Sequence, residues 1–181
     1  ASVSIPKGTT QVELLIPEEW AGQLTKTNQS SIKFELKTYN QSSLIGTQTK
    51  NIKFTIPATD NFLPQFNIQA IPNKNGLVPM LWDAIVQNKS TLTVKLNSFE
   101  GKYGSTYSSS YFIVCGKKKY GESAEFDLTE SGFVKIKTRV VDSRGLYRDE
   151  ECYVEVASYS IPTIVCNDIF RCDLDGTPNE N

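Results

Sequence analysis

The chain has 181 residues, of which 39% are hydrophobic and 22% charged, so it can bury the core of one or two soluble globular domains. Its net charge of −1 excludes the basic field that drives nucleic-acid binding. No apolar run approaches the roughly 20 residues that span a membrane. We therefore expect no nucleic-acid partner and no membrane segment. The start at Ala1 and the polar stretch 176–181 lead us to expect a fragment of a longer protein.

The first 57 residues predict strands around one helical turn. Residues 11–16 alternate apolar and polar side chains, as a half-buried strand does. Pro17 and two acids mark a helix start, with Trp20 and Leu24 expected against the sheet. Residues 32–36 alternate again, 40–43 form a turn, and a return strand runs to Pro57. Its inward side chains are expected to be Ile52, Phe54 and Ile56.

The following stretch, to about residue 156, reads as seven short strands in roughly 95 residues, which is typical of a β-sandwich. We expect a loop over 101–110 followed by a strand over 111–115, with the lysines 117–119 at a hairpin tip. Residues 133–141 alternate cleanly, 142–145 form a hairpin turn, and the chain returns through residues 147–156. The predicted core of this unit is Val134, Ile136, Val140, Val154 and Val156.

A strand that ends at a spacer, followed by a proline and a new apolar run, occurs twice. Pro64 and Pro162 mark the two copies and lie 98 residues apart, about the length of an immunoglobulin-type domain. The sequence thus predicts an all-β chain of tandem immunoglobulin-like or fibronectin-like antiparallel β-sandwich modules. The expected units are a partial or complete first module over 1–62, a second over 63–160, and the start of a third module or a linker over 161–181.

The residue types present argue against catalysis. The chain has no histidine, which removes the Ser-His-Asp and Cys-His arrangements and the His-Glu zinc motifs. Two acids suffice for glycoside hydrolysis, but the acid clusters at 18–19, 122–125 and 149–151 are better interpreted as solvated surface. We therefore expect no enzyme activity, no catalytic residue, no metal site and no cofactor.

The four cysteines lack the spacing of a zinc site. Cys115 and Cys152 are expected in strands as small hydrophobic residues. Cys166 and Cys172 lie close enough for a disulfide if two short strands face each other, and free thiols are the simpler interpretation.

Tyr103, Tyr107 and Tyr111 lie among glycines and serines. Tyrosine with Gly and Ser is the composition of adaptable binding loops, because tyrosine gives contact area at low entropic cost. The same composition also makes an ordinary loop. These three tyrosines are the candidate ligand-binding residues.

Several stretches, in order, resemble a family of siphophage minor structural and tail proteins of Gram-positive hosts. They are residues 38–57, 140–145, 159–164 and 171–177, and residues 86–90 resemble the strand entry of the family's second domain. The resemblance implies a non-catalytic structural or adhesive module of a tail fibre or tail-tip protein in the virion. The partners would be other tail proteins and host cell-wall glycans or a surface protein. The alternatives are a bacterial cell-surface adhesin or carbohydrate-binding module, and an accessory domain of a cell-wall hydrolase.

Overall fold

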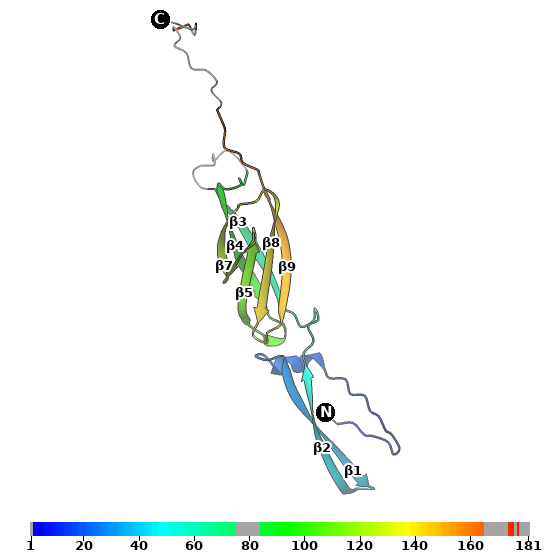
Figure 1. Cartoon of the computed structure of the whole chain (residues 1–181). Coiled ribbons are helices and arrows are strands. Elements are labelled where there is room, and N and C mark those ends of the chain that lie inside the picture. The colour runs from blue at the N-terminus through cyan, green and yellow to red at the C-terminus, as the bar shows by residue number, and fades with distance from the viewer. Residues whose placement is uncertain (1, 75–83, 165–173, 176, 178–181) are drawn as a thin grey trace.

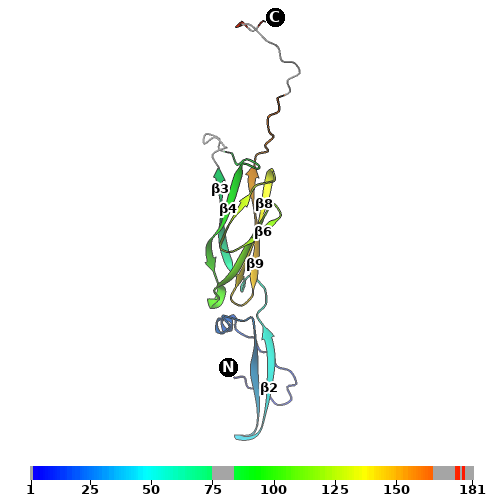
Figure 2. The same ribbon diagram turned by 60° about the vertical axis from the view of Figure 1, so that its left-hand side comes forward.

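The computed structural model describes residues 2–74, 84–164, 174–175 and 177, and the fold is all-β with antiparallel sheets. A long two-stranded hairpin lies at one end, and a two-layered sandwich continues from it along the same direction (Figure 1). A view turned by 60° shows the same end-to-end arrangement (Figure 2). Residues 75–83 and 165–173 lie outside the description, so the interpretations of Cys166 and Cys172 stay predictions.

The hairpin unit consists of the 3₁₀ helix η1 (Glu18–Gln23) and the strands β1 (Gln29–Asn40) and β2 (Ser43–Thr55). The helical turn after Pro17 and the strand–turn–strand pattern are confirmed. Ile32, Phe34 and Leu36 share one face of β1 because side chains alternate along a strand, and Ile32 pairs with Ile52 across the hairpin. Among the described residues no third strand pairs with this hairpin, and Leu36 on this face is 50% exposed.

Two expectations for this unit are wrong. Residues 11–16 form no strand, and Val12, Leu14 and Ile16 are exposed, because alternation makes a strand only where another strand supplies its hydrogen-bond partners. Ile52 is not inward either, with 46% of its surface exposed. Burial rises only toward the sandwich, where Phe54 is half-buried and Ile56 buried.

The described residues of the sandwich unit contain seven strands and the 3₁₀ turn η2 (Lys102–Gly104). One sheet has three strands in the order β3-β4-β7 and the other has four in the order β6-β5-β8-β9. All the strand pairs are antiparallel. The strands are β3 (Gln65–Lys74), β4 (Ser90–Glu100), β5 (Tyr107–Val114), β6 (Lys117–Tyr120), β7 (Ser123–Asp127), β8 (Gly132–Asp142) and β9 (Tyr147–Val156). Pro64 directly precedes β3 and Pro162 lies outside the strands, so neither proline interrupts a sheet.

The core of the sandwich lies between the two sheets. Every second side chain of β8 is buried, which confirms the inward face predicted for Val134, Ile136 and Val140. Val156 is also buried and Val154 is half-buried against this core. The buried cluster comprises Leu92, Val94, Phe112, Val114, Phe126, Leu128, Val134, Ile136 and Val156. Residues from both sheets contribute, so the layers are held together by apolar burial.

The turn after β5 corrects two further expectations. Val114 pairs with Lys117, so Cys115 and Gly116 form a two-residue hairpin loop, with φ of 47° and 70°. Such turns need positive φ at both central positions, which glycine adopts at no steric cost. Cys115 therefore lies in a turn and not in a strand, and the three lysines 117–119 lie in β6 and not at the hairpin tip.

The expected loop over 101–110 is also wrong in its extent. Residues 102–104 form η2, and β5 begins at Tyr107. Ser109 and Ser110 pair with Val141 and Val140 of β8 in spite of their low strand propensity, and the register shifts between Tyr107 and Ser109.

Candidate functional site: the joint between the hairpin and the sandwich

A second apolar cluster joins the hairpin unit to the end of the sandwich. Ala21 of η1 and Ile56, just past β2, come from the hairpin unit, and Leu146 comes from the turn between β8 and β9. Phe62 comes from residues 57–64, which connect β2 to β3 and are called the linker from here on. Leu24, Leu63 and Tyr103 pack around these four. The side chains come from segments far apart in sequence, so their burial fixes the position of the hairpin on the sandwich.

The turn between β8 and β9 contributes a buried ion pair to this joint. Asp142 and Arg144 both have side chains with 0% exposure, and Arg144 Nη2 lies 2.9 Å from Asp142 Oδ2. Asp142 Oδ1 accepts hydrogen bonds from the backbone N–H groups of Arg144 and Leu146, both at 2.9 Å. The carboxylate therefore holds both the turn and the arginine.

Arg144 also forms hydrogen bonds with the linker and with the segment after η2. Its Nη2 donates to the carbonyl oxygen of Phe62 at 2.8 Å and to Ser105 Oγ at 3.2 Å. Nη1 is buried and has no hydrogen-bond partner among the described residues. One side chain thus connects the β8–β9 turn, the linker and the segment after η2.

Further polar contacts surround this buried pair. Ser143 Oγ donates to the carbonyl oxygen of Thr25 and accepts from the backbone N–H of Thr106 at 3.0 Å. Arg148 donates through Nε to the carbonyl of Pro64 at 2.8 Å and through Nη2 to Asp60 Oδ1 at 3.0 Å. The hairpin unit, the linker and the sandwich are therefore bonded directly to one another.

Tyr103, a predicted ligand-binding residue, lies in this joint. Its ring centroid is 5.3 Å from that of Phe62, and its hydroxyl donates to Glu18 Oε2 at 2.9 Å. The hydrogen bond to Glu18, and to a lesser extent burial, raise the pKa of Tyr103. In the structure Tyr103 thus connects η2 to η1.

The other two predicted tyrosines lie elsewhere. The Tyr107 hydroxyl is 2.9 Å from Ser110 Oγ, and its ring is edge-on to Phe99 at 5.9 Å. Tyr111 lies within β5 and packs edge-on against Tyr120 at 5.9 Å. The three tyrosines therefore have separate neighbours and do not form one surface.

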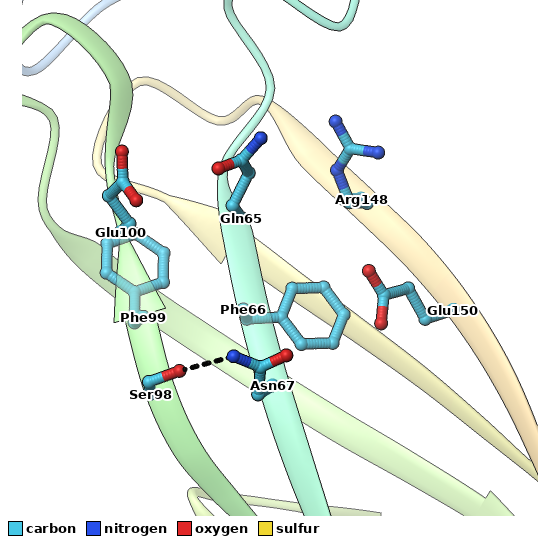
Figure 3. Close-up of a pocket in the computed structure, with 8 residues that line it drawn as sticks. All are labelled: Gln65, Phe66, Asn67, Ser98, Phe99, Glu100, Arg148 and Glu150. Atoms are coloured by element: carbon cyan, nitrogen blue, oxygen red, sulfur yellow. Dashed lines mark hydrogen bonds between the residues drawn. The ribbon is translucent and has the colours of Figure 1, made fainter.

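An open cleft of about 540 Å³ lies beside the joint, at the edge where β3 and β4 approach β9. Figure 3 shows Phe66 pointing toward Glu150, and the Asn67 side chain donating to Ser98 Oγ, a bond of 3.0 Å. The lining residues are Gln65, Phe66, Asn67, Ser98, Phe99, Glu100, Arg148 and Glu150. The Glu100 carboxylate is ion-paired with Lys102 at 2.7 Å.

The acid cluster 149–151 lies largely at the surface in ion pairs. Asp149 accepts two bonds of 2.6 Å from Arg139, and these hydrogen bonds lower the pKa of Asp149. Glu151 lies 2.8 Å from Lys135 Nζ and 3.5 Å from Lys137 Nζ. In the part of the chain that the structure describes, no group of three Cys, Asp or Glu side chains is arranged to hold a metal ion. Within the same ranges, no helix has the length and apolarity to cross a membrane.

Sequence reasoning identified the Asp-Ser-Arg-Gly stretch as a hairpin turn and missed its role in the joint. The sequence did contain a sign that this turn is buried, because Arg144 lies within it and the apolar Leu146 follows it. A turn that lies in solvent requires neither an arginine nor an apolar residue at these positions. The apolar Phe62 in the linker was a second signal of the same kind.

The fold and the joint define an all-β protein in which a hairpin unit is fixed end to end on a sandwich. Residues 3–173 match the family described as "Siphovirus protein of unknown function (DUF859)", which covers most of the chain. The chain belongs to this siphovirus family. No curated protein matches it.

Proposed function

We propose that the chain is a non-catalytic structural and adhesive part of a siphovirus tail, in a tail fibre or tail-tip protein, that presents a host-recognition surface. The observation that carries this proposal is the joint, in which a buried ion pair and an apolar cluster fix two β-units end to end. Membership of a siphovirus family supports a role in the virion.

The joint supports a spacer function because it resists bending. A linker with only solvated residues would allow its two units to move independently, as domains with small polar interfaces do. Here Phe62 and Leu146 are buried in the joint, and Arg144 bonds the linker directly. A segment of this kind holds a surface at a fixed distance and orientation from the rest of the virion.

The strand order favours an immunoglobulin-type sandwich for the second unit. If β3, β4 and β7 are strands A, B and E, then β6, β5, β8 and β9 are strands C′, C, F and G. This is the sheet composition of that fold without its strand D. We accordingly propose tandem modules with boundaries at 1–62, 63–160 and 161–181.

The proposed partners are neighbouring tail proteins and the cell wall of a Gram-positive host, through its glycans or a surface protein. A bacterial adhesin of the same fold and an accessory domain of a cell-wall hydrolase are the alternatives. The siphovirus family favours the tail protein over the adhesin.

Immunogold electron microscopy of intact virions tests the proposal. Antibodies raised against the 181-residue chain are expected to label the tail or its tip. Labelling of bacterial surfaces but not of virions would support the adhesin instead. Release of soluble sugar or peptide from host cell walls by the purified chain would contradict the non-catalytic assignment.

The rigidity of the joint, on which the spacer function depends, is tested separately. Small-angle X-ray scattering of the chain should give an elongated particle, and Arg144→Ala combined with Phe62→Ala should broaden the distribution of dimensions. The matched control is Arg139→Ala, which removes an arginine from a surface ion pair. Equal scattering curves for the joint variant and the control would overturn the spacer function.

A further inference from the structure

The outward face of the four-stranded sheet carries an unusual set of exposed aromatic side chains. The register places Tyr120 opposite Tyr111 and Lys135 opposite Tyr153, with Phe133 two residues before Lys135 on the same face. We define the aromatic face as Tyr111, Tyr120, Phe133, Tyr147 and Tyr153, all at outward positions of β5, β6, β8 and β9. Four of them are exposed and Tyr111 is half-buried. Phe133 is 76% exposed and Tyr120 71%. Along β8 these rings form two groups, with Tyr111, Tyr120 and Tyr147 beside residues 139–141 and Phe133 and Tyr153 beside residues 133–135. Clustered exposed apolar side chains are a mark of interaction surfaces.

Cationic side chains lie between these rings and hold them. Lys118 Nζ lies 3.6 Å from the centroid of Tyr111 and 4.9 Å from that of Tyr120. Arg139 Cζ lies 3.8 Å from the centroid of Tyr147 and 5.7 Å from that of Tyr111. Cation–π contacts of this kind restrict the side chains before any ligand arrives, so less entropy is lost on binding.

Three cations of the aromatic face, Lys135, Lys137 and Arg139, have carboxylate partners, and Lys118 lies over the rings of Tyr111 and Tyr120. Arg139 is bonded twice to Asp149 across the strands, while Lys135 and Lys137 both approach Glu151. A polyanion gains little from cations that already have carboxylate partners. The face therefore fits an uncharged ligand better than a nucleic acid or an acidic polymer.

A neutral saccharide chain has the complementary chemistry. Sugar rings present flat C–H faces that pack on aromatic rings, and hydroxyl groups that exchange hydrogen bonds with paired carboxylate and ammonium groups.

We propose that the aromatic face binds a neutral saccharide chain of the host surface. This inference rests on the proposed host-recognition function and identifies both the surface and the class of ligand. Of the three tyrosines predicted from the sequence it includes Tyr111 and leaves out Tyr103 and Tyr107, because in the structure those two have partners elsewhere.

Affinity electrophoresis and calorimetry with neutral polysaccharide purified from the host strain test the inference. The intact 181-residue chain is compared with Tyr120→Ala/Tyr147→Ala and with Phe133→Ala/Tyr153→Ala. Tyr39→Ala is the matched control, because Tyr39 is an exposed tyrosine on β1 of the other unit. Unchanged urea-unfolding midpoints establish that the variants are folded.

The intact chain is expected to bind, the Tyr120/Tyr147 variant to bind about tenfold more weakly or worse, and Tyr39→Ala to bind normally. Three outcomes overturn the inference: no binding by the intact chain, binding by both double variants that is as strong as that of the intact chain, or binding only to acidic polymer that high salt abolishes. Tail labelling in electron microscopy without polysaccharide binding leaves the tail function standing and removes this inference alone. Absence of tail labelling removes the tail function whatever the polysaccharide result.

Discussion

Asp142 and Arg144 form a fully buried ion pair within a single hairpin turn, and the arginine also bonds the linker from the other unit. Buried charges are expensive to desolvate, so the pair persists because both partners are present and hydrogen-bonded. The turn is thus part of the interface between the two units.

Arg144→Ala is predicted to destabilise the chain by about 3–5 kcal/mol, because it leaves the Asp142 carboxylate buried without its cation. Urea denaturation followed by circular dichroism measures this loss. Lys137→Ala is the control, since its ion pair with Glu151 is exposed, and it should cost about 1 kcal/mol or less. Equal costs for the two variants would mean that the buried pair contributes no more than a surface pair.

Ile136→Ala is predicted to cost about 2–5 kcal/mol, since this side chain is fully buried between the two sheets. Phe133→Ala, on the outward side of the same strand, is the control. The Phe133 side chain is 76% exposed, so its loss should change the free energy of unfolding by about 0.5 kcal/mol or less. Both are measured by urea denaturation. A loss below about 0.5 kcal/mol for Ile136→Ala would place its side chain outside the core.

The sequence was sufficient to predict those strands in which buried and exposed side chains alternate. Residues 133–141 alternate because one side of β8 faces the core, and the structure buries that side. The same alternation over residues 11–16 gave a wrong strand, because period two describes the side chains and not the hydrogen-bond partner that a strand also needs.

The joint was beyond sequence reasoning for a related reason. Phe62, Leu146 and Arg144 are separated by up to 84 residues, and each looks like an ordinary linker or turn residue in its local context. Only the packing of one unit on the other buries them. The aromatic face was hidden similarly, since register across four strands brings its side chains together.

The joint should respond to alkaline pH through Tyr103. Its pKa is raised by the hydrogen bond to Glu18, so the neutral phenol is favoured in the folded state. The resulting stabilisation is fully present below the unfolded value of about 10 and is lost as pH rises through the higher folded value. Urea midpoints of the intact chain and of Tyr103→Phe, which keeps the ring against Phe62, should therefore converge above about pH 10. A constant difference between them up to pH 11.5 would argue against this hydrogen bond.

Cys152 is predicted to react slowly with iodoacetamide in the folded protein. Burial, and after it the charge of Glu150, raise the pKa of its thiol, so less of the reactive thiolate exists at neutral pH. Alkylation at pH 7.5, followed peptide by peptide with mass spectrometry, should be slower for Cys152 in buffer than in urea. Glu150→Gln removes the smaller of the two causes and should raise the folded rate modestly. A rate in buffer equal to that in urea would mean that the side chain is not shielded against the sandwich core.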